Sequence, residues 1–272
     1  MVYFDHSAST IPSKVVLDYF YNCNLILPGN YNSPHELGKN IKEEVNKATK
    51  ELLNLLKLDN SYDIIYTSGA TEANNYVISS FTKKNNIDLV ITFKFEHSSI
   101  IAPVSVLQKQ GKIVEFVNYD KDGRVDLNHL KELLDNNKNS KTLVSISPLN
   151  SELGIRQDIK TIKEIIKKYD NVYFHTDATQ AIGKIDEDYN GIDMISFSSH
   201  KFYGLKGVGG LIYRKELKFD SLINGGESYS KYRSGTPFHP LILSIVSALK
   251  YVLDNNNYDY VLELNNKFLL FY

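Results

Sequence analysis

The sequence predicts an α/β fold built on a mostly parallel sheet of seven strands. From residue 60 onward, short runs rich in β-branched and aromatic residues alternate with segments of helical periodicity, which is typical of consecutive β–α–β units. The chain of 272 residues is long enough to bury a full core, which favours one large α/β domain with a smaller part attached. Hydrophobic residues at 42% and charged residues at 23% are ordinary values for a globular protein.

The expected strands are short apolar runs bounded by turn-forming residues. They cover residues 62–67, 89–93, 113–117, 142–146, 172–176, 194–198 and 209–214. Helices are expected where apolar side chains recur every three or four positions, with Asp126 and Asp158 at N-cap positions and Pro240 in a first helical turn. They cover residues 41–58, 71–81, 98–110, 127–136, 159–169 and 240–253.

Composition argues against several kinds of partner and location. The formal net charge is −1 and the isoelectric point is near 6.7, so no basic surface for nucleic acid or an anionic membrane is expected. No apolar run approaches the roughly 20 residues that span a bilayer, and residues 1–6 lack the features of a signal peptide. Cys23 is the only cysteine, which fits a reducing compartment, and we expect it to be an inert packing residue in an amphipathic helix. We therefore expect a cytoplasmic protein without a metal site.

The segment that carries most chemistry begins with Asp177 at the end of an apolar strand and leads to Lys201 in a small, polar loop. A pyridoxal phosphate enzyme needs such a pair, because the lysine forms a Schiff base and the carboxylate pairs with the pyridinium nitrogen. At about 4 Å and an effective dielectric of about 20, that pairing is worth about 4 kcal/mol, which would keep the ring nitrogen protonated. The alternative for Asp177 is a structural role, capping the turn into Ala178.

The turn after the first strand is the candidate phosphate site. Residues 66–74 read YTSGATEAN, so the strand ends in small residues just before a helix begins near Thr71. Free backbone amides and the positive end of the helix dipole would converge there on a phosphate. The alternative is an ordinary strand-to-helix turn with Thr71 as its cap. No Walker A or GxGxxG sequence follows a strand, so nucleotide versions of the site have no support.

Three further polar segments follow strands or lie in nearby loops. His97 follows the strand at 89–93, where an imidazole could stack on a planar cofactor and move protons, or simply cap a helix. Asn150 and Ser151 follow the strand at 142–146 and could hydrogen-bond a cofactor ring or form a polar turn. The loop at 233–237 could bind an anion, contact a subunit or form a surface turn.

Taken in order, these segments resemble the cysteine desulfurases of the NifS/IscS type, within the class V aminotransferase family. The resemblance covers essentially the whole chain. The matching segments are residues 3–10 (YFDHSAST), Gly29-Asn30 with Ser33, His35 and Gly38, and residues 67–72 (TSGATE), 96–97 (EH), 150–154 (NSELG), 177–180 (DATQ), 198–201 (SSHK) and 233–236 (RSGT). The resemblance implies the large domain of a pyridoxal phosphate (PLP)-dependent transferase of the aspartate aminotransferase type, in a homodimer.

By this resemblance, Lys201 and His97 are the catalytic residues: Lys201 carries the cofactor as an internal aldimine, and His97 stacks on its ring. Asp177 binds the pyridine nitrogen, and Gln180 hydrogen-bonds the phenolic oxygen. The other implied cofactor contacts are Ala70, Thr71, Ser198 and His200 at the phosphate, Asn150 and Ser151 at the ring, and Thr236 at the phosphate of the partner subunit. Ser151 departs from the family pattern, because it is a shorter donor than the usual asparagine.

The implied reaction removes sulfur from L-cysteine, giving alanine and an enzyme persulfide whose sulfur passes to an acceptor protein, as in iron–sulfur cluster assembly. We expect residues 1–14 to belong with a small domain, 15–255 to form the cofactor-binding domain and 256–272 to begin a C-terminal region that is largely missing. In the family that region holds the persulfide-forming cysteine and an arginine for the substrate carboxylate. The arginines of this chain are Arg124, Arg156, Arg214 and Arg233.

The expectation is therefore a truncated chain whose cofactor site is intact and whose sulfur transfer is impaired. Two alternatives stay open. One is another class V aminotransferase or lyase activity that needs no catalytic cysteine. The other is a non-catalytic remnant that serves as an interaction module.

Overall fold

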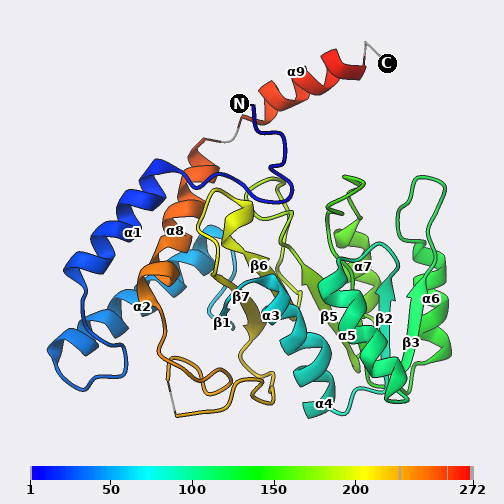
Figure 1. The fold of residues 1–272 in the computed structure, drawn as a ribbon. Helices are drawn as coiled ribbons and strands as arrows, with labels where there is room; N and C mark the ends of the chain where they lie inside the picture. The colour runs from blue at the N-terminus through cyan, green and yellow to red at the C-terminus, as the bar shows by residue number, and fades with distance from the viewer. Residues whose placement is uncertain (1, 227, 256, 270–272) are drawn as a thin grey trace.

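The fold is a seven-stranded sheet with helices packed on both faces (Figure 1). The computed structural model describes residues 2–226, 228–255 and 257–269. The strands are β1 (Tyr62–Thr67), β2 (Leu89–Phe93), β3 (Ile113–Val117), β4 (Thr142–Ser145), β5 (Val172–Asp177), β6 (Met194–Ser198) and β7 (Gly209–Arg214). Their spatial order is β1-β7-β6-β5-β4-β2-β3, and only β7 runs antiparallel to its neighbours. The mostly parallel, seven-stranded sheet is confirmed.

The ends of two strands differ from the expected ones by one residue. The strand β4 stops at Ser145 rather than at residue 146, and β5 continues to Asp177, which pairs with Ser196 of β6. The backbone of Ala178 then donates to the Ser196 carbonyl at 2.9 Å, which holds the end of β5 against β6. The backbone of Asp177 is therefore held by the sheet, while its side chain also caps the following turn by accepting the Thr179 backbone N–H at 3.1 Å.

The helices agree with the expected order but not with every boundary. They are α1 (Lys14–Ile26), α2 (Glu36–Leu55), α3 (Ala70–Asn75), α4 (Thr82–Lys84), α5 (Ser98–Lys109), α6 (Leu127–Asn136), α7 (Ile159–Ile166), α8 (His239–Asp254) and α9 (Tyr258–Leu269). The helix expected at 71–81 runs without a break through α3, a π-helical stretch at Tyr76–Phe81 and α4. The helix expected at 41–58 is α2, which ends earlier because Lys57 adopts a positive φ of 58°. Asp126 and Asp158 are confirmed as caps, since each side chain accepts a backbone N–H of the following helix.

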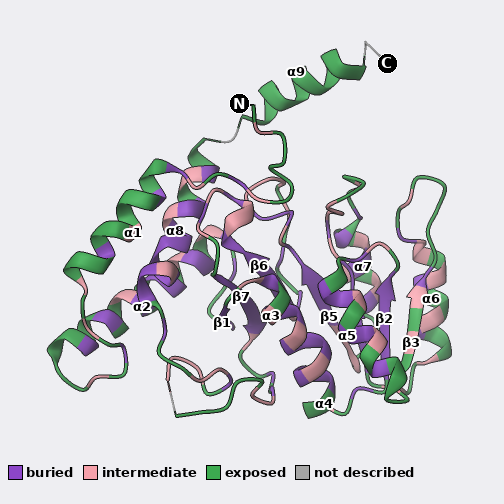
Figure 2. Ribbon diagram, in the orientation of Figure 1, coloured by how far each residue is buried: buried purple, intermediate pink, exposed green. Residues whose placement is uncertain are grey.

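Alternate strand residues face two different layers of the core, as the two-residue period of a strand requires. In β2, Leu89 and Ile91 pack in the layer that also contains residues of α1, α2, α7 and α8, whereas Val90 packs in the layer that contains residues of α5 and the π-helical stretch. Figure 2 shows the result as buried strands between partly exposed helices. Cys23 is buried in α1 at 3% exposure, as a packing residue would be.

The helix α9 differs from the others, because none of its described residues is buried and it stands off the main body (Figures 1 and 2). Its exposed side chains include Tyr260, Val261 and Phe268. Within the described part of the chain, no helix is both long enough and apolar enough to cross a membrane.

Candidate functional site

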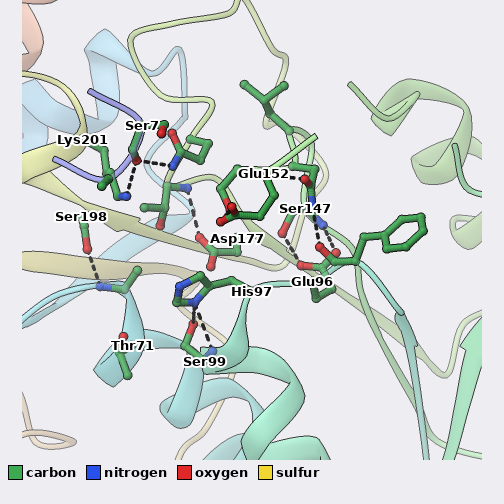
Figure 3. Close-up of a pocket in the computed structure, with 18 of the residues that line it drawn as sticks. Ser7, Thr71, Glu96, His97, Ser99, Ser147, Glu152, Asp177, Ser198 and Lys201 are labelled. Atoms are coloured by element: carbon green, nitrogen blue, oxygen red, sulfur yellow. Dashed lines mark hydrogen bonds between the residues drawn. The ribbon is translucent and has the colours of Figure 1, made fainter. Parts of the chain in front are cut away.

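A cavity of about 480 Å³ lies at the carboxyl edge of the parallel strands, where ligands usually bind in such sheets. Its wall is built by the loops that follow β2, β4, β5 and β6, by the start of α3 and by the N-terminal segment around Ser7 (Figure 3). Ten of the predicted site residues line it, and Thr236 is the one that does not. The ten are Ala70, Thr71, His97, Asn150, Ser151, Asp177, Gln180, Ser198, His200 and Lys201.

Asp177 is a buried carboxylate at the floor of this cavity. Its Oδ1 accepts the backbone N–H of Thr179 at 3.1 Å, and its Oδ2 accepts the Asn74 side-chain amide at 2.7 Å. The side chain is 7% exposed. A fixed carboxylate in such surroundings can hold a protonated ring nitrogen more strongly than it could in water.

Lys201 is the one lysine among the described residues that line the cavity. Its Nζ donates to the Ser7 carbonyl at 2.5 Å (Figure 3). Partial burial lowers the pKa of Lys201, although Asp177 and two other carboxylates oppose the shift. A lowered pKa makes the uncharged, nucleophilic amine more accessible near neutral pH.

The loop that carries Lys201 is held by the N-terminal segment. The Thr10 backbone and hydroxyl both donate to the His200 carbonyl, at 2.9 and 2.8 Å, and the Tyr203 backbone N–H donates to the Thr10 hydroxyl at 2.7 Å. Tyr203 adopts a positive φ of 63° in this turn. Such a conformation is uncommon for a tyrosine, and these contacts hold it.

His97 is both a helix cap and a cavity residue, so the two alternatives for it are not exclusive. Its Nδ1 accepts the Ser99 backbone N–H at 3.1 Å at the start of α5 and lies 2.8 Å from the Ser99 hydroxyl. The ring stands on the cavity wall near Asp177 and Thr71 (Figure 3).

Gln180 is oriented by contacts at both ends of its amide. The Nε2 atom donates to the Ser7 carbonyl at 2.8 Å, and the Oε1 atom accepts the Lys184 ammonium at 2.5 Å. Burial, and to a lesser extent the charge of Lys201, lowers the pKa of Lys184 to about 8. The Lys184 contact keeps the donor end of Gln180 turned toward the cavity side.

The turn at residues 67–71 has the geometry expected of an anion cradle. The Ala70 backbone N–H donates to the Ser198 hydroxyl at 2.7 Å, and Ala70 begins the continuous helical run that ends with α4. Gly209 allows β7 to approach this turn, because a Cβ at Gly209 would stand 2.3 Å from the Phe197 carbonyl and 2.8 Å from the Gly69 Cα. Helix dipole, amide and hydroxyls therefore converge on one corner of the cavity.

Asn150 and Ser151 lie on the cavity wall, but their own turn uses most of their polar atoms. The Asn150 Nδ2 donates to the Phe95 carbonyl at 2.6 Å, and its Oδ1 accepts the backbone N–H groups of Glu152 and Leu153 at 2.9 and 2.6 Å. The Ser151 hydroxyl donates to the Glu152 carboxylate at 3.2 Å. The polar-turn alternative therefore describes the geometry of Asn150.

Thr236 is exposed and lies in a second, smaller pocket beside Ser68 and Arg233. The Arg233 Nε donates to Glu72 at 3.0 Å, while the other oxygen of Glu72 accepts the Ser68 backbone N–H at 2.8 Å. This ion pair ties the loop at 233–237 to the anion cradle. An exposed Thr236 beside the cradle is compatible with the expected contact to a partner subunit.

Two buried residues at or near the site were not assigned a role from the sequence, although Glu96 belongs to one of the matching segments. His175 lies two positions before Asp177, between the hydroxyls of Ser145 and Ser196 at 2.9 Å each, and burial lowers its pKa to about 4. Glu96 accepts the Ser147 backbone N–H at 2.7 Å and the Ser147 hydroxyl, which joins the loops after β2 and β4 (Figure 3). Both contacts cross between strands, so the local sequence around either residue does not reveal them.

The buried carboxyl of Glu96 leads to a prediction on pH and stability. Burial raises the pKa of Glu96 from 4.5 to about 8, despite the hydrogen bonds from Ser147. The folded state therefore keeps a proton that the unfolded state loses above about pH 4.5, so stability is full below that pH and declines as the pH rises to about 8. The decline is up to about 1.4 kcal/mol per pH unit for one proton.

We expect Glu96→Gln, which imitates the protonated acid, to remove this part of the pH dependence. Urea unfolding of both proteins at several values between about pH 5 and pH 8 measures it. The two curves should be close at the acid end and should diverge by a few kcal/mol toward pH 8. Parallel curves over the whole range would show that Glu96 is ionised in the folded protein.

Comparison with known proteins gives the family. The sequence profile described as Aminotransferase class-V matches residues 2–268. The chain belongs to the class V aminotransferase family. This family uses pyridoxal 5′-phosphate, so the cofactor expected from Asp177 and Lys201 is the one that the family requires.

Relatives within the family are cysteine desulfurases. The chain is 35% identical to "Cysteine desulfurase, mitochondrial" from Eremothecium gossypii, with 95% of this chain and 53% of the relative covered. It is 36% identical to "Cysteine desulfurase IscS" from Buchnera aphidicola, with 89% and 61% covered. The chain therefore spans between half and two thirds of the length of these curated relatives.

Solved structures agree with the fold. A NifS-like protein from Rickettsia africae superposes with a TM-score of 0.88 at 30% identity, covering 100% of this chain and 76% of that one. The structure titled "SspA in complex with cysteine" gives a TM-score of 0.84 at 30% identity, covering 92% and 73%. The aspartate aminotransferase-like fold expected for this class V chain is thereby confirmed.

The residues of the cavity fit pyridoxal phosphate. An amine, a buried carboxylate and an anion cradle surround one space of suitable size. The Thr179 hydroxyl on its wall is buried without a hydrogen-bond partner among the described residues, as expected for a group that awaits a ligand. Within the described ranges, no group of three or more metal-ligating side chains was found.

Proposed function

We propose that this chain is the cofactor-binding part of a PLP-dependent cysteine desulfurase that acts on L-cysteine. The observation that carries the proposal is the pairing of Lys201 and Asp177 in one cavity of a class V chain whose curated relatives are cysteine desulfurases. In the full reaction the Cβ–S bond of cysteine breaks and a sulfur–sulfur bond forms with an enzyme thiol. The thiol and L-cysteine become a persulfide and L-alanine, so atoms and electrons balance without an external oxidant.

The cofactor supplies, when bound, an electron sink for the pair of electrons left at the substrate's α-carbon. Lys201 provides the amine for covalent attachment, and its lowered pKa favours the free base. Asp177 would hold positive charge on the ring nitrogen of a bound cofactor, because its carboxylate is buried and its two oxygens are fixed by the Thr179 N–H and the Asn74 amide. The amine and the carboxylate thus hold the cofactor at two separate points.

Five side chains complete the proposed cofactor sites of a dimer. His97 stands on the cavity wall and can stack on a planar ring, while the donor end of Gln180 can reach a phenolic oxygen. Ser198 contacts the Ala70 amide at the start of α3 and His200 lines the same cavity, and both would bind the phosphate together with the amides of Ala70 and Thr71. Thr236 would reach the phosphate site of the second subunit of a homodimer.

Sulfur transfer needs a thiol that the described cavity does not contain. Cys23 is the single cysteine of the 272 residues, lies in α1 and does not line the cavity. No arginine lines the cavity among the described residues either. The proposal therefore assigns residues 15–255 to cofactor binding, with the segment around Ser7 closing one wall of the cavity, and assigns the acceptor thiol to another segment or protein. Residues 1–14 and 256–272 would also connect to a smaller domain.

Reconstitution of the purified 272-residue chain with pyridoxal phosphate tests the proposal. We expect a visible absorption band, and a spectral change when L-cysteine is added, because ten of the eleven residues proposed to contact the cofactor, Lys201 and Asp177 among them, line the cavity. We expect no cyanide-labile sulfur on the protein, because Cys23 is 3% exposed and lies outside the cavity.

The controls separate the remaining possibilities. A stronger spectral response to another amino acid than to L-cysteine would favour a different class V aminotransferase or lyase activity. The absence of any visible band, with the fold intact by circular dichroism, would favour a non-catalytic interaction module. Desulfurase turnover like that of a full-length relative would contradict the assignment of the thiol to another segment.

A further inference from the structure

Asn74 is a fully buried amide that the proposed function leaves without a role. It lies on α3 at 0% exposure and does not line the cavity. Its Nδ2 donates to two partners, the Asp177 Oδ2 at 2.7 Å and the Ser99 hydroxyl at 2.8 Å. Its Oδ1 is buried and has no hydrogen-bond partner among the described residues. An unpaired buried acceptor is unfavourable, so its presence at the edge of a site needs an explanation.

The Asp177 carboxylate explains why the amide does not turn over to satisfy its oxygen. A flipped Asn74 would point its Oδ1 at a carboxylate oxygen 2.7 Å away, and two acceptors would then face each other. The orientation is therefore fixed by charge, and both N–H groups of the amide are used. One holds Asp177, and the other reaches Ser99.

The Ser99 hydroxyl links the orientation of the Asn74 amide to the hydrogen bonding of His97. Because Ser99 accepts from Asn74, its own hydrogen is free to point at the His97 Nδ1, 2.8 Å away. The Ser99 backbone N–H points at the same nitrogen from 3.1 Å. The Nδ1 atom is thus an acceptor twice over, so the ring proton belongs on Nε2, which makes no hydrogen bond to any residue in the described ranges.

We propose that Asn74 is a positioning residue that sets the carboxylate of Asp177 and, through the Ser99 hydroxyl, reinforces the His97 tautomer that the Ser99 backbone N–H also favours. The two groups come from β5 and from the cap of α5, and Asn74 on α3 is the residue that both depend on. The proposal rests on the proposed function only in that Asp177 and His97 act on the same cofactor. If Asn74 served only to link α3 to α5, the hydrogen bond to Ser99 would be sufficient. The amide could then rotate so that its Oδ1 also accepts a hydrogen bond.

Two variants and a control test the proposal on the whole 272-residue chain. Asn74→Ala removes the hydrogen bonds from Asn74 to Asp177 and to Ser99. Ser99→Ala removes the hydroxyl that contacts the His97 Nδ1. The control Asn75→Ala removes a side-chain hydrogen bond to the Thr71 carbonyl on the same helix. Histidine labelled with ¹⁵N reports the tautomer of His97 in the cofactor-free chain, with the signal assigned by its loss in His97→Gln. Pyridoxal phosphate labelled at the pyridine nitrogen reports the protonation of that atom, and a binding titration gives its Kd.

We expect wild type and Asn75→Ala to show a His97 ring protonated at Nε2. Ser99→Ala keeps the backbone N–H that donates to the His97 Nδ1 and loses only the hydroxyl donor, so a minor fraction of the Nδ1-protonated tautomer should appear, with little change in Kd. Asn74→Ala should show the same minor fraction and should also bind the cofactor about tenfold more weakly or worse, with a less protonated ring nitrogen. If Asn74→Ala does not fold, Asn74→Ser is measured instead, with the same expectation.

The outcomes that overturn the proposal are specific. An unchanged His97 tautomer in both Ser99→Ala and the folded Asn74 variant would show that the relay is wrong. An unchanged Kd and unchanged ring-nitrogen signal in the Asn74 variant would show that Asp177 needs no such support. A wild-type chain that binds no cofactor would contradict the proposed function, but the tautomer would still be measured without cofactor, so the two failures are distinguishable.

Discussion

Replacing Lys201 by alanine is expected to abolish covalent attachment of pyridoxal phosphate. The physical reason is that no other described lysine lines the cavity, and the partly buried Lys184 donates its Nζ to the Gln180 Oε1 at 2.5 Å. Borohydride reduction of the reconstituted chain, followed by peptide mass analysis, measures the attachment. We expect the wild type to carry one reduced cofactor at Lys201 and the variant to carry none, which corresponds to a loss of at least about 100-fold in labelled protein.

Lys206→Ala is the matched control, because Lys206 is exposed, five positions further along the chain and outside the cavity. This control should be labelled like the wild type. Labelling of Lys201→Ala at Lys184 would show that the second lysine can reach the cofactor, and the assignment of the amine would then be wrong.

Replacing Asp177 by asparagine has the second largest expected effect, on cofactor affinity and on the ring nitrogen. An ion pair at about 4 Å with an effective dielectric of about 20 is worth about 4 kcal/mol, so the Kd should rise by up to about three orders of magnitude. The pyridine nitrogen should lose its proton at neutral pH, because the same energy is worth about three pKa units. Titration with the cofactor and ¹⁵N spectra of labelled cofactor measure the two effects.

Asp193→Asn is the appropriate comparison for this variant. Asp193 lies at the opposite end of β6 from the cavity, pairs with Arg214 at 3.4 Å and accepts the Phe174 backbone N–H at 2.7 Å. Its replacement removes a partly buried, hydrogen-bonded carboxylate in the same way and should affect stability more than Kd. Equal losses of affinity in both variants would mean that Asp177→Asn acts through the fold rather than through the ring nitrogen.

The sequence predicts the sheet well because its strands are defined locally. Five of the seven strands begin and end at the predicted residues, since each is an apolar run closed by turn-forming residues. The direction of β7 was not predicted, although the short glycine-rich return between β6 and β7 favours an antiparallel pair, because a parallel neighbour needs a longer crossover. The π-helical stretch at Tyr76–Phe81 was not predicted either, because its apolar pattern resembles that of an α-helix.

The site was predictable where a residue type is tied to a strand end. Asp177, His97 and Lys201 all follow strands whose carboxyl ends meet at one edge, so their assembly follows from the parallel sheet. Asn74 and Glu96 were not assigned a role, because what identifies them is a partner 103 or 51 positions away in the chain. The assignments of individual residues to cofactor atoms stay predictions until the experiments above are done.

The contacts of the N-terminal segment bear on when the site can form during synthesis. The Ser7 carbonyl accepts Gln180 and Lys201, which lie 173 and 194 positions later, and Thr10 holds the loop at residues 200–203. The N-terminal segment is synthesised first, but it can pack against the loop at residues 200–203 only after about three quarters of the chain has been synthesised. A chain interrupted before residue 203 would have most of its parallel strands and no closed cavity, and cofactor binding would report completion of this late step.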